Sequence, residues 1–137
     1  MFSVSATADG RSRVGDLSAH FSRSEFACKC GCGGVQVNPV LIEALEDIRE
    51  FSGIPMIITS GWRCPAHNAA VGGTPSSAHL TGEAADFFVS GNIDRFKFLE
   101  AIFTYGPKRV GIGSDFIHVD VKTDAPQEVV WLYGGDK

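Results

Sequence analysis

The stretch SAHLTGEAADFFV, residues 77–89, decides how the fold is interpreted. Its second half has the apolar composition of a short buried strand, and Asp86 lies inside that strand. A carboxylate among apolar neighbours is costly unless it is paired with a cation or bound to a metal ion. His79 lies in the same stretch, and mostly small residues separate it from Asp86. We therefore expect a strand that presents a carboxylate ligand, with a histidine close by.

A second apolar stretch, FIHVDV at residues 116–121, has the same feature. Strand alternation puts Phe116, His118 and Asp120 on one face, and the β-branched residues between them on the other. Imidazoles and a carboxylate suit Zn²⁺, and three protein ligands leave a fourth position for water, as in catalytic sites. The sequence thus predicts a zinc site made by His79, Asp86 and His118. For each residue alone, a hydrogen-bonded core histidine or a capping aspartate is the simpler interpretation.

Three groups of residues together resemble a known family. They are Ser77-x-His79-x-x-Gly82-x-Ala84-x-Asp86, the later His118-Val119-Asp120, and the upstream stretch SGWR at residues 60–63. They resemble the zinc D-Ala-D-Ala carboxypeptidase family. That family shares a zinc-site fold with D,D-dipeptidases, phage L-alanyl-D-glutamate endolysins and the hedgehog signalling domain. The resemblance covers roughly residues 21–122, which is most of the chain.

The resemblance implies zinc-dependent hydrolysis of peptide bonds in peptidoglycan stem peptides, of the D,D-carboxypeptidase or endopeptidase type. It implies that His79, Asp86 and His118 hold the Zn²⁺. It also implies that Arg63 lies beside the metal and contacts the substrate, and that Ser77 contacts the substrate. The fixed fork of donors on Arg63 suits a terminal carboxylate or a tetrahedral oxyanion, with a structural salt bridge as the alternative. The alternative functions are a zinc-stabilised binding module without turnover and a structural phage or wall protein.

A zinc hydrolase also needs a carboxylate that accepts a proton from water and passes it to the leaving amine. Asp115 lies three residues before the expected metal ligand His118, where several members of the resembled family carry an acidic base. Asp120 lies two residues after it, on the same strand face. The resemblance favours Asp115 as the base. Asp120 is the alternative base, or a carboxylate that orients a ligand or Arg63.

The order of elements predicts an α+β fold with helices packed on a small, mostly antiparallel sheet. Asn38, Pro39 and Gly53 delimit one helix, because they suit the cap, the first turn and the end. A second helix is expected over residues 93–105, and strands over 56–59, 84–89, 109–112, 116–121 and 129–133. The second helix is expected to turn Phe96, Leu99, Ile102 and Phe103 inward. We expect residues 1–20 to form an arm, residues 21–137 one domain, and residues 60–77 a long irregular loop.

Four cysteines fall outside the predicted zinc site: Cys28, Cys30, Cys32 and Cys64. A disulfide from Cys64 to one of the first three would close a loop of more than 30 residues, worth about 3–4 kcal/mol. Free thiols and a second zinc ion are the alternatives. The Cys-x-Cys-x-Cys spacing is a poor match to the usual Cys-x2-Cys of zinc sites.

Composition and charge limit the classes of partner. The chain has 137 residues, of which 44% are hydrophobic and 20% charged, as in a globular domain. Its net charge of −4 makes nucleic acid an improbable partner, and it means that a local cation must capture any acidic ligand. No apolar stretch is long enough for a membrane span, and the N-terminus does not resemble a secretory signal. We expect a monomer that acts on the cell wall, in the periplasm, outside the cell or with a phage.

Overall fold

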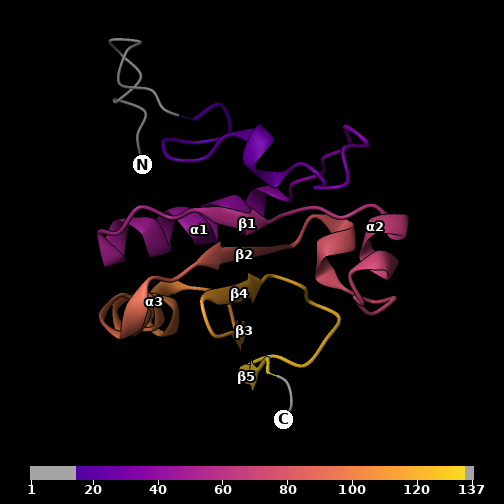
Figure 1. Cartoon of the computed structure of the whole chain (residues 1–137). Helices are drawn as coiled ribbons and strands as arrows, with labels where there is room; N and C mark the ends of the chain where they lie inside the picture. Colours follow the sequence, from indigo (N-terminus) through magenta and orange to yellow (C-terminus); the bar gives the residue numbers. More distant parts are fainter. Residues whose placement is uncertain (1–14, 135–137) are drawn as a thin grey trace.

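The computed structural model describes residues 15–134, and these form the predicted α+β arrangement (Figure 1). Five strands form one sheet in the order β1-β2-β4-β3-β5, with every pairing antiparallel except that of β3 with β5. The strands are β1 (Ile58–Ser60), β2 (Ala84–Phe88), β3 (Arg109–Ile112), β4 (Phe116–Asp120) and β5 (Val129–Leu132). The helices are α1 (Pro39–Ser52), α2 (Pro65–Ala70) and α3 (Gly91–Tyr105), with 3-10 turns η2 (Arg23–Phe26) and η3 (Ala78–Thr81).

Helix α1 begins and ends where the sequence predicts. The Asn38 side chain accepts a hydrogen bond from the Val40 N–H, and Pro39 occupies the first turn. Gly53 ends the helix in the left-handed conformation, which glycine adopts without steric cost. These are local signals, so this helix is confirmed at both ends.

The inward face of α3 differs from the prediction. Phe98 and Ile102 are buried, whereas Phe96 and Phe103 are 68% and 62% exposed. Apolar residues occur almost all around this helix, so periodicity alone does not select one face. The buried face is determined by the element that packs against it: the Phe98 ring packs edge-on against Phe87 of β2, with 4.9 Å between the ring centroids.

The two faces of the sheet have different roles. On one face, Phe87, Ile117 and Val119 join residues of α1 and α3 in the hydrophobic core. On the other face, Asp86 of β2 and His118 and Asp120 of β4 lie outside this core, and His79 of η3 lies against them. The alternation predicted for β4 is therefore confirmed, and it directs His118 and Asp120 away from the core.

Two segments are more ordered than the sequence suggests. The predicted irregular loop over residues 60–77 contains α2, which Pro65 begins and the Cys64 sulfur caps by accepting from the His67 N–H at 3.4 Å. Of the expected arm, residues 1–14 lie outside the described part of the chain. Residues 15–20 lie against α1, where the buried Glu46 accepts from the His20 N–H at 2.8 Å. Within residues 15–134, no helix combines the length and apolar composition needed to cross a membrane.

Candidate metal centre

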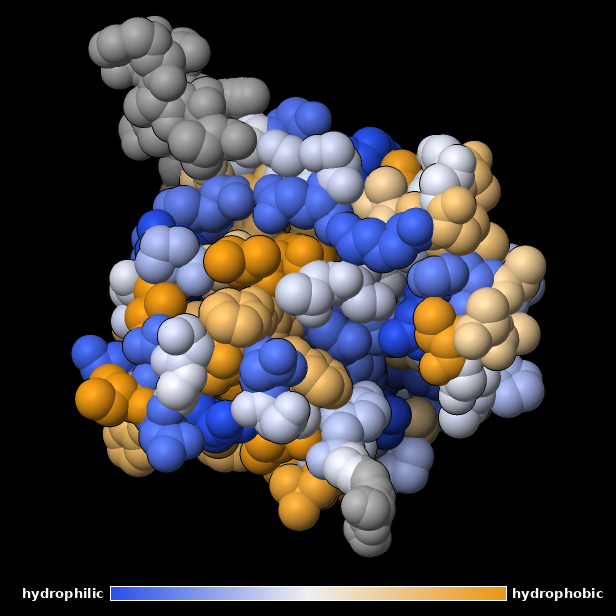
Figure 2. Space-filling view, in the orientation of Figure 1, coloured by the Kyte–Doolittle hydropathy of each residue, from blue (hydrophilic) through white to orange (hydrophobic). Residues whose placement is uncertain are grey.

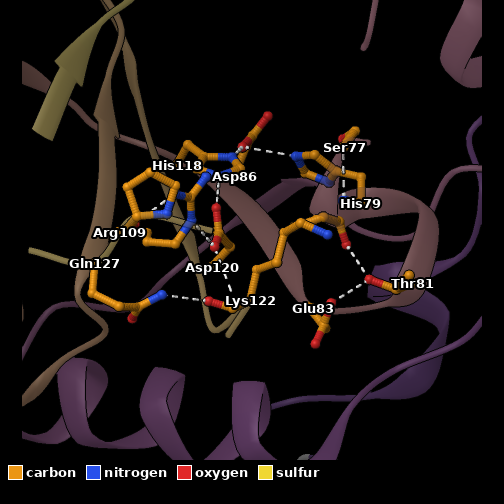
Figure 3. A network of polar contacts seen from close by, with 12 residues as sticks. Ser77, His79, Thr81, Glu83, Asp86, Arg109, His118, Asp120, Lys122 and Gln127 are labelled. Carbon is orange, nitrogen blue, oxygen red and sulfur yellow. Dashed lines mark hydrogen bonds and ion pairs between the residues drawn. The ribbon is translucent and has the colours of Figure 1, made fainter. Parts of the chain in front are cut away.

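His79, Asp86 and His118 converge on one point although they come from three elements. Asp86 of β2 and His118 of β4 are directly opposite each other in the antiparallel ladder, so their side chains leave the sheet side by side. His79 reaches them from η3 (Figure 3). One potential ligand atom from each residue lies within 4.8 Å of the other two.

The turn that carries His79 is fixed by its neighbours. The Ser77 hydroxyl caps η3 by accepting from the His79 N–H at 3.2 Å, and Gly82 ends it with a φ of 76°. A Cβ on Gly82 would lie 2.5 Å from the Gln36 carbonyl oxygen, so this position needs glycine. The resemblance implies that Ser77 contacts the substrate, and this stays a prediction. The structure shows it as a cap, and it also lines the cavity described below.

The hydrogen bond of His79 fixes which of its nitrogens can bind a cation. Its Nδ1 lies 2.7 Å from the Gly61 carbonyl oxygen, which can only accept, so Nδ1 carries the proton. In the neutral ring, Nε2 then presents a lone pair. Nε2 is buried and has no hydrogen-bond partner, although Asp86 Oδ1 lies 3.3 Å away. A lone pair that faces a carboxylate oxygen is relieved by a proton or a metal ion between them, and metal-bound histidines are oriented in this way.

His118 is oriented in the same way by a carboxylate. Its Nε2 donates to Asp120 Oδ2 at 2.7 Å, and its Nδ1 lies 2.8 Å from Asp86 Oδ1. Burial disfavours the charge on Asp86, but contacts with His118 and His79 outweigh it and lower the pKa of Asp86. Burial also opposes charge on His118, yet its bonds to Asp120 and Asp86 raise the pKa of its imidazole. The three side chains form an electrostatically coupled unit.

Both carboxylate oxygens of Asp120 accept hydrogen bonds within this network. Oδ2 accepts from His118, while Oδ1 accepts from Arg109 Nε at 2.7 Å and from the Lys122 N–H at 3.2 Å. The side chain is only 1% exposed. Burial opposes its charge, and the contacts with His118 and Arg109 outweigh burial and lower the pKa of Asp120. This geometry holds the His118 ring in one orientation, with Nε2 protonated.

Asp115 lies elsewhere. Its side chain is exposed at the turn between β3 and β4, and its carbonyl oxygen accepts from the Val89 N–H at 2.8 Å. Arg95 donates to the carbonyl oxygens of Gly113 and Ser114, at 2.9 and 2.8 Å, and so holds this turn. Asp115 is not among the residues that line the cavity. Its role as a base stays a prediction that rests on the resemblance.

Arg63 lies near Asp86, and its position beside a metal ion stays a prediction that rests on the resemblance. Its Nη2 lies 4.0 Å from Asp86 Oδ2, and its Nη1 donates to Asn68 Oδ1 at 3.0 Å. Asn68 is buried and its amide donates to the Thr74 carbonyl oxygen at 2.9 Å. The asparagine therefore connects the guanidinium to the backbone of the loop. Arg63 is part of the cavity wall, and its only ion pair within the described residues is the long contact with Asp86.

A cavity of about 630 Å³ is lined by the two histidines of this group, His79 and His118, and by Arg63 and Asp120. Figure 2 shows the surface hollowed between α2 and the lower strands, with hydrophilic residues at the floor of the hollow. One side is made of small residues, among them Gly72, Gly73 and Ser76. The sequence did not indicate the other side, where Trp131 and Tyr133 come from β5 and the residue after it. Burial is the main reason why the pKa of Tyr133 is raised, so its phenol is neutral at pH 7.

A comparison with models of known protein families identifies the family of this chain. The model of the family described as Peptidase M15 matches residues 19–120, which include all three converging residues. The chain belongs to the peptidase M15 family. A comparison with curated proteins finds no match. This M15 chain is therefore a metallopeptidase, which confirms the resemblance to the zinc D-Ala-D-Ala carboxypeptidase family. The orphaned Nε2 of His79 fits the metal dependence of the family.

Proposed function

We propose that this M15 peptidase is a zinc enzyme that hydrolyses peptide bonds in peptidoglycan stem peptides, with His79, Asp86 and His118 as the metal ligands. The observation that carries the proposal is the buried His79 Nε2, which has no hydrogen-bond partner and faces Asp86 Oδ1. Two imidazoles and one carboxylate are a ligand set typical of catalytic zinc, which keeps one position open. Bound zinc supplies Lewis-acid chemistry that polarises a carbonyl and makes water a nucleophile at neutral pH.

The protein's own residues orient the ligands and the substrate. Gly61 and Asp120 each accept a hydrogen bond from one ring nitrogen of a histidine, so the other nitrogen of that ring is the one left for a metal ion. Arg63 presents its guanidinium to the cavity, where it binds a substrate carboxylate or the oxyanion that develops at the scissile carbonyl. Since the whole chain carries a net charge of −4, this local cation is needed to hold an acidic group.

Support for stem peptides comes from the cavity wall. The glycines and serines of residues 72–77 leave room for the backbone of a peptide with small side chains, such as one that ends in D-alanine. A terminal carboxylate of such a peptide lies within the reach that Arg63 offers. The resemblance favours Asp115 for proton transfer, although its side chain lies outside the cavity lining, whereas the hydrogen bonds of Asp120 support an orienting role.

Two substrates test the function. Purified peptidoglycan and a synthetic peptide ending in D-Ala-D-Ala are incubated with the zinc-loaded protein, and the products are identified by mass spectrometry. Release of D-alanine from the peptide supports a carboxypeptidase, and cleavage of peptidoglycan alone supports an endopeptidase. If neither substrate is cut while zinc is bound at the three residues, the chain is a zinc-stabilised binding module.

Arg63→Lys should impair turnover far more than stability. Lysine keeps the charge but does not have the planar fork that grips a carboxylate in two places. A charge-assisted hydrogen bond is worth about 1.5–3 kcal/mol, so kcat/KM should fall roughly tenfold to a hundredfold without it. Thermal melting should shift by only about a few degrees, because the substitution removes little from the folded state besides the hydrogen bond to Asn68.

The matched control is Arg23→Lys, because Arg23 is exposed and lies outside the metal cavity. It should leave both kcat/KM and melting unchanged. Normal turnover of Arg63→Lys would remove Arg63 from the substrate site.

A further inference from the structure

The four cysteines form a second cluster, separate from the cavity over His79. Cys28, Cys30 and Cys32 alternate in the segment that follows η2, and Cys64 immediately precedes α2. All four are free thiols, and their sulfur atoms lie within 4.8 Å of one another. None of them lines the cavity of the metal centre.

Three of the sulfur atoms are separated by distances close to the edges of a zinc–thiolate tetrahedron. The Cys28–Cys30 distance is 3.4 Å, and Cys64 lies 3.7 Å from each of those two sulfurs. A zinc–sulfur bond of ~2.3 Å in tetrahedral geometry places neighbouring sulfurs about 3.8 Å apart. A disulfide would instead bring one pair together and leave the others apart. Near-equal separations within three sulfurs, with the fourth close by, favour shared coordination.

Backbone N–H groups point at the sulfur atoms. The Cys64 N–H donates to the Cys28 sulfur, the His67 N–H to the Cys64 sulfur, and the Gly34 N–H to the Cys32 sulfur, each at 3.4 Å. Hydrogen bonds to a thiolate favour its negative charge, which a metal ligand needs. Three of the four sulfurs therefore have polar support from the backbone.

Two glycines explain how an unusual spacing converges. Gly31 and Gly33 have φ values of 87° and 82°, a region that other residues rarely adopt. The chain therefore turns sharply after Cys30 and again after Cys32, and the Cys28 N–H closes the turn by donating to the Gly34 carbonyl oxygen at 3.0 Å. The glycine turns between the cysteines thus bring closely spaced sulfur atoms together, as the Cys-x2-Cys spacing does in common zinc sites.

We propose that Cys28, Cys30, Cys32 and Cys64 bind a second metal ion as four thiolates, and that zinc is this ion. Thiolate ligands in a tetrahedral arrangement select zinc among the common divalent cations. Four protein ligands fill the coordination sphere, so the ion is structural and leaves no position for substrate.

This ion would link residues 28–34 to Cys64, at the start of the segment that carries Arg63 and α2. Cys64 follows Arg63 directly, and the Arg63 N–H donates to the His79 carbonyl oxygen at 3.2 Å. On the other side, the Trp62 N–H donates to the Phe26 carbonyl oxygen at 2.9 Å. The four-cysteine site thus holds the backbone that carries the cavity's arginine.

Metal counting tests the proposal. Protein purified under reducing conditions and loaded with zinc should contain about two ions per chain, and Cys30→Ser/Cys32→Ser about one. These two cysteines are exposed, so replacing their sulfur atoms with oxygen removes no packing from the hydrophobic core. Reconstitution with cobalt should give thiolate-to-metal charge-transfer absorption in the wild type and in His118→Ala, and not in the double serine variant.

Two results would overturn the proposal. One is a wild type that binds cobalt without thiolate charge transfer while its four thiols stay free. The other is a disulfide from Cys64 to Cys28, Cys30 or Cys32 in protein purified without oxidant and with zinc present. A His118→Ala protein with unchanged metal content would contradict the proposed peptidase centre and leave the cysteine site standing, so the two failures are distinguishable.

Discussion

His118→Ala is expected to remove one metal ion per chain and to abolish peptide hydrolysis. The variant deletes the Nδ1 that faces Asp86 Oδ1 at 2.8 Å, and it leaves two ligands where catalytic sites have three. Metal activation of a carbonyl and of water is worth several kcal/mol, so turnover should fall by more than about 10³-fold. The measurements are elemental analysis after dialysis and product formation from peptidoglycan.

Two further variants make this result decisive. Asp86→Asn is nearly isosteric and removes the central charge, so it should also release the ion even if the His118→Ala protein folds poorly. His67→Ala is the matched control, because His67 lies in the neighbouring α2 outside the converging group. It should retain metal and turnover. Full metal content in both His118→Ala and Asp86→Asn would exclude these residues as ligands.

The parts of the fold that sequence predicts well are those with local causes. Helix α1 has a cap, a proline and a terminal glycine within its own residues, so both ends follow from the sequence. Helix α2 has only six residues, too few for a periodic pattern, and its cap is a cysteine sulfur rather than a usual capping side chain. The buried face of α3 depends on Phe87, a partner from another element.

The same distinction applies to the metal centre. The cost of burying Asp86 and His118 in apolar strands is visible in the sequence, and it correctly indicates that these residues need partners. Trp131 and Tyr133 could not be found in this way. They reach the cavity because β5 pairs in parallel with β3, and that long-range pairing has no local signal. The hydrogen bonds of Asp120, which Asp115 does not share, are likewise visible only in the three-dimensional structure.

Asp120→Asn is expected to weaken metal binding and turnover together. An asparagine cannot satisfy all three donors that now surround the carboxylate. If its oxygen faces His118, its NH₂ group is directed at Arg109 and the Lys122 N–H, so donors oppose donors. If the NH₂ group faces His118 instead, the proton of the ring moves to Nδ1, the nitrogen that must bind the metal.

Both arrangements damage the centre, so metal affinity should fall roughly 10–100-fold. Asp115→Asn is the matched control for metal binding: its exposed side chain should leave metal affinity within about a few-fold of wild type, as for other surface changes. Affinity is measured by competition with a chelator, and turnover at saturating zinc. A fall of about 10²–10⁴ in turnover of Asp115→Asn with metal retained would give Asp115 the role of general base. Unchanged affinity in Asp120→Asn would contradict the orienting role, because a carboxylate that fixes the tautomer of a ligand cannot be removed without weakening that ligand.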